Sequence, residues 1–271
     1  MSPYDAGVPS TLAPYPDRTL LDYLADLARD HPNQPALLFK GATITWGGLE
    51  RLSDACASAF NALGIKRGDR VALLLPNCPQ FSIAQFAAWK LGAIVAPLNP
   101  IYTEHELEGP LREHGVETIV ALTRFYDRVK RVQPRTPVRR VIATNIKEHF
   151  PLALKVLFTL LREKRDGDRI ALAAGDHDFA HLLLVNRGRR APRTAVAAAD
   201  PAVLLMSGGT TGTPKGVLGT HGAYVMAGLQ VGAWNADAQA SLSRSRSLQV
   251  RVAPLNISAG PFGRSRARSA R

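Results

Sequence analysis

One stretch decides how this sequence is interpreted: Ser207-Gly208-Gly209-Thr210-Thr211-Gly212-Thr213-Pro214-Lys215-Gly216. It follows an apolar run at 202–206, which predicts a buried strand. A glycine-rich turn that leaves a strand lets successive backbone N–H groups converge on an anion, and hydroxyls and a lysine add donors and charge. The composition therefore indicates a phosphate-binding loop, and the alternative is a solvated Gly/Thr loop without a ligand.

The pattern differs from the Walker loop of P-loop nucleotide hydrolases, G-x-x-x-x-G-K-[ST]. In that loop a glycine precedes the lysine and a hydroxyl residue follows it. Here Pro214 precedes Lys215, and Gly216 follows it. The sequence therefore disfavours a P-loop NTPase.

The same ten residues resemble the phosphate-binding motif of the adenylate-forming (AMP-binding) superfamily, which includes acyl-CoA synthetases, luciferases and the adenylation domains of peptide synthetases. That motif is roughly [ST]-[SG]-G-[ST]-[TS]-G-x-[PA]-K-G, and every position from 207 to 216 matches it. Glycine at the second place, Gly208, resembles the fatty acyl-CoA synthetase branch. Residues 90–100 are similar to the family's K-x-G-A-x-x-x-P-L-N-P stretch, for which we expect a structural role. The resemblance covers roughly residues 19–228.

The resemblance implies a two-step reaction. A carboxylate attacks the α-phosphate of ATP to give an acyl-adenylate, and a thiol, usually that of coenzyme A, then displaces AMP. The implied cofactors are ATP, Mg²⁺ and coenzyme A, and the implied partner is a fatty acid or another carboxylate. Hydroxyls and glycine backbone would approach the phosphates, and the lysine would neutralise the β and γ groups with Mg²⁺. The expected cofactor-binding residues are Ser207, Gly208, Gly209, Thr210, Thr211, Gly212, Lys215 and Gly216.

The resemblance also implies elements that this sequence lacks. These are an adenine pocket like Y-G-x-T-E, an acidic group for the ribose like T-G-D, and a mobile C-terminal domain with a catalytic lysine. We assign no catalytic residue and no metal ligand. We expect a truncated chain, similar to the N-terminal half of a long-chain fatty acyl-CoA synthetase. By family it would be an acid–thiol ligase, inactive alone; an alternative is a non-catalytic fragment that binds ATP phosphates.

Upstream of the loop, apolar strands alternate with amphipathic helices. Strands are predicted at 71–75, 94–98, 119–122 and 138–143, and helices at 20–28, 49–63, 80–91, 103–114 and 125–132. Such alternation predicts an α/β fold, with a parallel sheet that carries helices on both faces. This would be the incomplete N-terminal part of the adenylate-forming fold. A hairpin that turns at Lys40-Gly41 precedes it.

The last residues have a different composition. From Asn235 onward they are mostly Ala, Ser, Arg, Gly and Pro, and residues 241–271 hold seven arginines and no acid, out of a net charge of +12. Such a segment cannot bury enough apolar surface to order itself. We expect a disordered tail that arose from a lost reading frame near 234–240. The alternative, an Arg/Ser arm that binds nucleic acid, is disfavoured because only Phe262 interleaves the arginines.

The predicted organisation is an extended arm at 1–18, the truncated AMP-binding domain at 19–234, and the basic tail at 235–271. Two cysteines, Cys56 and Cys78, give neither a disulfide framework nor metal-ligand spacing. The sequence shows no secretory signal and no membrane span. We therefore expect a cytoplasmic location, with peripheral contact with a membrane as the alternative.

Two further segments leave alternatives open. Residues 150–165 are apolar and then basic, which fits a helix at a membrane surface or an ordinary packed helix with a solvated basic end. We expect the packed helix, although long-chain acyl-CoA synthetases carry a similar insertion. Thr220-His221 resembles the family's T-H dipeptide at a helix start, and a structural role is expected for His221. The usual asparagine is replaced by Ala223, which puts the helix cap in doubt.

Overall fold

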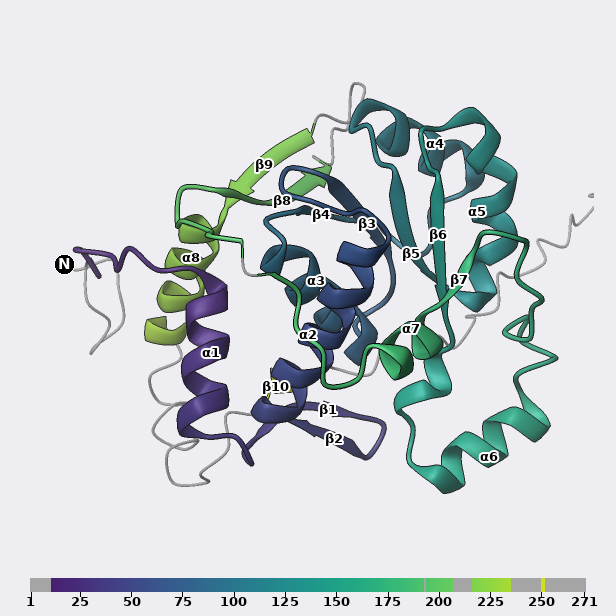
Figure 1. Cartoon of the computed structure of the whole chain (residues 1–271), viewed down its shortest axis with the longest axis horizontal. Coiled ribbons are helices and arrows are strands. Elements are labelled where there is room, and N and C mark those ends of the chain that lie inside the picture. The colour runs from purple at the N-terminus through teal and green to yellow at the C-terminus, as the bar shows by residue number, and fades with distance from the viewer. Residues whose placement is uncertain (1–10, 193, 207–215, 235–249, 252–271) are drawn as a thin grey trace, which may run out of the picture.

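The computed structural model describes residues 11–192, 194–206, 216–234 and 250–251. Within them, one sheet has the strand order β7-β6-β5-β3-β4-β8-β9 (Figure 1). Its strands are β3 (Arg70–Leu74), β4 (Ile94–Pro97), β5 (Thr118–Leu122), β6 (Arg140–Thr144), β7 (His177–Asp178), β8 (Pro201–Met206) and β9 (Gly216–Thr220). All neighbouring pairs are parallel except the antiparallel pair of β8 and β9. The predicted α/β fold with a mainly parallel sheet is confirmed.

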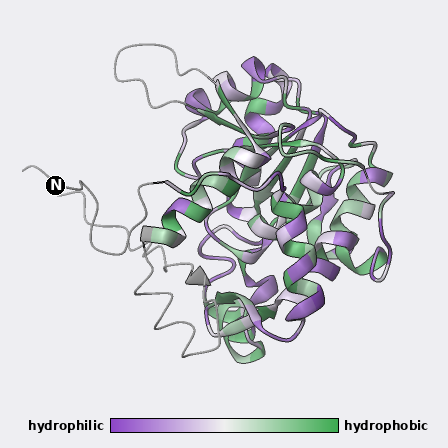
Figure 2. Ribbon diagram, turned by 90° about the vertical axis from the view of Figure 1, so that its left-hand side faces the viewer, coloured by the Kyte–Doolittle hydropathy of each residue, from purple (hydrophilic) through white to green (hydrophobic). Residues whose placement is uncertain are grey.

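Helices cover both faces of this sheet. The helices are α1 (Leu20–Asp30), α2 (Trp46–Ala62), α3 (Pro79–Lys90) and α7 (Phe179–Val185) at one face, and α4 (Glu104–Glu113) and α5 (Tyr126–Val132) at the other. Side chains alternate along β3, so that Val71 and Leu73 join the first core, whereas Ala72 and Leu74 join the second. Figure 2 shows hydrophobic strands in the interior and helices that carry both hydrophobic and hydrophilic residues.

Local sequence signals place several element boundaries as predicted. Thr19 and Thr103 each begin a helix with a capping box, because the side chain accepts from a backbone N–H of the first turn. Gly64, with φ of 81°, follows the end of α2. The predicted hairpin is formed by β1 (Pro35–Phe39) and β2 (Ala42–Thr45), and its turn residues Lys40 and Gly41 have positive φ angles.

Other features differ from the prediction or extend it. Strand β8 is buried only at its start, because it pairs with β4 at Val203 alone. Beyond that point the side chain of Leu205 is 42% exposed. The two-residue strand β7 and helix α7 were not predicted, since so short a strand has no periodicity. Short 3-10 helices lie at η1 (Thr123–Phe125), η2 (Gln133–Arg135) and η3 (Ile146–His149).

The segment after the sheet is described only in part. Helix α8 (His221–Trp234) begins at the predicted dipeptide. Of residues 235–271, the structure describes β10 (Val250–Arg251), which pairs in parallel with β1. These two residues differ from the expected disordered tail, and for the others that expectation lies outside the described residues. Among the described helices, none has the length and apolar character to cross a bilayer.

Candidate functional site

The hairpin of β8 and β9 carries the predicted phosphate-binding loop. Met206 ends β8, Gly216 begins β9, and the two residues are antiparallel partners. Neighbouring strands lie about 5 Å apart, so the loop leaves and re-enters the sheet at one point. Of the predicted cofactor-binding residues the structure describes Gly216. The others lie outside the described residues: Ser207, Gly208, Gly209, Thr210, Thr211, Gly212 and Lys215.

His114, the residue that follows α4, packs against both ends of this loop. Its ring contacts the side chain of Met206, and a Cβ atom at Gly216 would lie 2.5 Å from its Cε1. A larger residue at 216 would therefore force the His114 ring to move, so close packing as well as the motif favours glycine there. Burial lowers the pKa of His114 below its ordinary value. The sequence gives no signal for this contact, because 92 positions separate His114 from Met206.

Trp89 of α3 holds β8 in place. Its indole Nε1–H donates to the carbonyl oxygen of Ala202 at 2.8 Å, and its ring meets that of His221 edge-on at a centroid distance of 5.3 Å. His221 is 1% exposed, and burial lowers its pKa. An imidazole enclosed in this way and packed against Trp89 agrees with the structural role expected for His221.

Thr220 resolves the doubt about the cap of α8. Its Oγ1 accepts from the backbone N–H of Ala223 at 3.2 Å, so threonine supplies the cap and an asparagine is not needed. Large apolar side chains are exposed on β9 and α8, next to this cap. They are Val217, Leu218, Met226, Leu229 and Val231.

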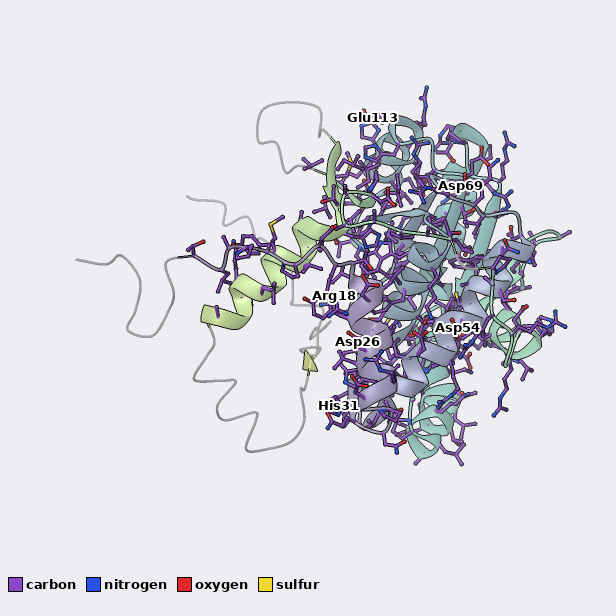
Figure 3. All side chains as sticks on the ribbon, turned by 60° about the vertical axis from the view of Figure 1, so that its left-hand side comes forward. Arg18, Asp26, His31, Asp54, Asp69 and Glu113 are labelled. Atoms are coloured by element: carbon purple, nitrogen blue, oxygen red, sulfur yellow. The ribbon has the colours of Figure 1, made fainter. Side chains whose placement is uncertain are left out.

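A groove of about 480 Å³ lies beside the hairpin, between Met206 and α4. Its charged lining has an acidic excess, with Glu106, Glu108 and Glu113 against Arg112, and Figure 3 labels Glu113 at this end of the molecule. Carboxylates repel a polyphosphate, so the groove does not extend the phosphate site. A triphosphate at this hairpin would depend on donors from residues 207–216, a stretch that contains no acid.

The stretch similar to K-x-G-A has a structural function, as expected. Lys90 Nζ lies 3.0 Å from Glu50 Oε2 and 2.7 Å from Asp54 Oδ1, which ties α3 to α2. Asp54, labelled in Figure 3, also pairs with Arg190 at 3.1 Å. Gly92 has φ of 70°, and a Cβ there would meet the side chain of Arg67. Among the described residues, no group of His, Cys, Asp and Glu could hold a metal ion.

A polar cavity of about 380 Å³ lies at the carboxyl ends of β5 and β6. Glu148 lines it and accepts from Thr144 Oγ1–H and from the backbone N–H of Asn145, each at 2.7 Å. Burial is the main cause that raises the pKa of Glu148 to about 7, although these hydrogen bonds lower it. The folded protein therefore keeps the proton on Glu148 up to about pH 7, whereas the unfolded chain releases it near pH 4.5.

The stability of the protein should consequently fall as the pH rises from about 4.5 to about 7, because there the folded state binds more protons than the unfolded chain. Relative to Glu148→Gln, the wild type should lose roughly 2–3 kcal/mol over this range. Burial lowers the pKa of neighbouring His149 to about 4, which gives an opposite slope, but both proteins retain His149. Urea unfolding between pH 4.5 and 8 measures the difference. Equal pH profiles for the wild type and Glu148→Gln would contradict the prediction, and exposed Glu113→Gln serves as control.

Comparison with known proteins gives a consistent result. The family described as AMP-binding enzyme matches residues 24–258. A long-chain-fatty-acid–CoA ligase of Bacillus subtilis (strain 168) is 33% identical over 227 residues, which are 82% of this chain and 40% of that protein. The ligase of the same description from Haemophilus influenzae is 33% identical over 207 residues, 75% of this chain and 37% of that protein. The chain thus spans about 40% of the length of the curated relatives that it matches.

Solved structures show the same architecture. A long-chain-fatty-acid–CoA ligase from Archaeoglobus fulgidus superimposes with a TM-score of 0.66 and 22% identity, over 85% of this chain and 42% of that chain. An anthranilate–CoA ligase in complex with anthranoyl-AMP gives a TM-score of 0.62 and 19% identity, over 77% of this chain and 36% of that chain. At these identities the likeness shows a shared fold, of which this chain has a part.

Proposed function

This chain belongs to the AMP-binding enzyme family, and on that premise we propose that it binds the triphosphate of ATP through residues 207–216. The observation that carries the proposal is the matching motif, which connects the two strands of the β8–β9 hairpin where the His114 ring packs closely against Gly216. The relatives are named as ligases of long-chain fatty acids. We therefore propose a long-chain fatty acid as the carboxylate, and coenzyme A as the thiol, of the complete reaction.

The residues of the loop would act by charge and by hydrogen bonding. Backbone N–H groups at Gly208, Gly209 and Gly212 would approach the phosphates, and the hydroxyls would donate to them. Lys215 would neutralise charge that develops on the pyrophosphate, a task that Mg²⁺ shares when it is bound. The 271 residues lack the adenine-pocket motif and the catalytic lysine that the family pattern implies. We propose that they bind ATP without turnover, within the domain at 19–234.

Lys215→Ala should weaken the binding of Mg·ATP at least about tenfold, because a hydrogen bond to a charged group contributes about 1.5–3 kcal/mol. Isothermal titration of the full chain measures this affinity. Lys164→Ala removes an exposed lysine elsewhere and should leave the affinity unchanged. The proposal fails if the wild type does not bind Mg·ATP, or if both variants bind it equally well.

Turnover is tested separately. ATP–pyrophosphate exchange with a long-chain fatty acid should not exceed the background without enzyme. Exchange catalysed by this chain alone would disprove the absence of turnover, and it would leave the binding proposal intact.

A further inference from the structure

Helix α6 (Leu152–Leu161) turns large aliphatic side chains outward. Their exposed fractions are 78% for Leu152, 50% for Val156, 53% for Leu157, 76% for Leu160 and 63% for Leu161. These residues are spaced by four along the helix, in two adjacent rows, and form one continuous apolar face that we call the aliphatic stripe. The expectation of an ordinary packed helix is therefore wrong, because such a helix buries its apolar face.

The opposite side of α6 is fixed to the body of the protein. Phe158 meets Phe150 edge-on at a centroid distance of 5.6 Å, and Phe150 lies 5.8 Å from Phe39 of β1. Lys147 donates to Thr159 Oγ1 at 3.0 Å. These contacts determine which face of α6 points outward, and that face is the aliphatic stripe.

Positive charge follows directly after the stripe. In residues 162–169 the exposed charged side chains are all basic, namely Arg162, Lys164, Arg165 and Arg169. The acids between them are withdrawn, since Glu163 and Asp168 are buried and Asp166 is half-buried. An apolar helix face bordered by exposed basic residues is the pattern that binds in the interface of an anionic bilayer.

The position of α6 in the fold argues against cover by more of this chain. Along the chain, helix α6 lies between β6 and β7 at one edge of the sheet, whereas β9 and α8 lie at the other edge (Figure 1). The part of residues 235–271 that the structure describes, β10, pairs with β1, and the aliphatic stripe stays exposed beside it. At that other edge, exposed residues such as Val217 and Leu218 form a separate apolar surface. The aliphatic stripe is distant from this surface and carries the basic border, which α8 lacks.

We propose that α6 docks this protein on an anionic lipid membrane, with the aliphatic stripe among the acyl chains and residues 162–169 at the headgroups. The proposal rests on the proposed function for one point only, that a membrane is the source of an apolar carboxylate substrate. Binding by α6 itself needs neither ATP nor a fatty acid.

A fluorescent probe on the stripe tests the proposal. Leu160→Cys can be labelled with an environment-sensitive nitrobenzoxadiazole dye, because native Cys56 and Cys78 are buried and burial raises both thiol pKa values, that of Cys78 to about 12. Vesicles of phosphatidylcholine and phosphatidylglycerol at 0.15 M salt should raise the emission at least about threefold and shift it to the blue. The matched probe at Leu218→Cys on β9 should change little.

Sedimentation with the same vesicles gives a second measurement. Leu160→Asp should weaken binding at least about tenfold, whereas Thr159→Asp adds the same charge to the same helix without removing an apolar group and should cost at most about threefold. Vesicle binding with no response at Leu160→Cys would place the contact elsewhere, for instance on the arginines of 241–271, and would overturn the proposal. Loss of self-association in Leu160→Asp without loss of vesicle binding would also overturn it.

Failure of this proposal can be told apart from failure of the proposed function. Lys215→Ala should bind vesicles as the wild type does, and Leu160→Asp should bind Mg·ATP as the wild type does. Each measurement therefore tests one proposal without the other.

Discussion

Trp89→Ala should lower the free energy of unfolding by about 4 kcal/mol, the usual cost of deleting a fully packed tryptophan side chain. Trp89 is 2% exposed and meets Phe86 edge-on at 5.4 Å, so its removal leaves a cavity between α3 and β8. The carbonyl of Ala202 would also lose its donor. Because β8 leads into the predicted phosphate loop, the affinity for Mg·ATP should fall together with the stability. Urea unfolding followed by circular dichroism measures the first effect.

Two further variants separate the causes of this loss. Trp89→Phe keeps most of the apolar volume but lacks the indole N–H, and it should cost about 1–2 kcal/mol. Ile101→Ala truncates a side chain that is 80% exposed, and it should change the stability by less than about 0.5 kcal/mol. A loss below about 1 kcal/mol for Trp89→Ala would show that α3 and β8 do not pack as described.

Asp168→Ala should cost about 3–5 kcal/mol, because it leaves a partly buried cation without its partner. The carboxylate of Asp168 has no exposed surface and lies 2.5 Å from Arg124 Nη2. It also accepts from Thr123 Oγ1 at 3.1 Å, so one side chain ties the segment after α6 to the end of β5. Urea unfolding measures the loss. Faster tryptic cleavage after Lys164 or Arg165 would show whether this segment opens first.

Asp166→Ala is the matched control for Asp168→Ala. Asp166 lies two residues away, and its partners Arg162 and Arg165 are exposed, so its loss should cost less than about 0.5 kcal/mol. Equal stability of the two variants would contradict the anchoring role of Asp168. Asp168→Asn keeps the shape and some of the hydrogen bonds, and its cost should lie between the two.

The sequence predicts well what depends on neighbouring residues. The helix starts at Thr19 and Thr103 follow from a hydroxyl residue with an acid three positions later, and both capping boxes are present. The buried strands β3, β4, β5 and β6 follow from short apolar runs between helices, and this alternation determines the fold class.

Features that depend on distant residues were not predictable in this way. The antiparallel return of β9 and the contact of His114 with Met206 arise from tertiary packing. The hydrogen bond from Trp89 to Ala202 likewise joins residues 113 positions apart. The candidate site is therefore known from its motif, whereas its supporting contacts are known only from the structure.

The outward face of α6 shows a second limit of sequence patterns. Apolar residues occupy almost every position from 152 to 161, so periodicity cannot say which of them point inward. The aromatic contacts of Phe158 and Phe150 decide the question, and they turn Leu152, Val156 and Leu160 to the outside.

The strand order determines whether the binding of two negatively charged ligands, a nucleotide and an anionic lipid, would be coupled. Six strand spacings, about 29 Å, separate the edge at β7 from the edge at β9. In physiological salt, electrostatic forces fade over about 8 Å, so the cations beside α6 add almost nothing to the potential at the hairpin. Nucleotide and lipid should therefore bind independently. In the double variant, Lys215→Ala should weaken Mg·ATP binding and Leu160→Asp should weaken vesicle binding by the same factors as in the single variants.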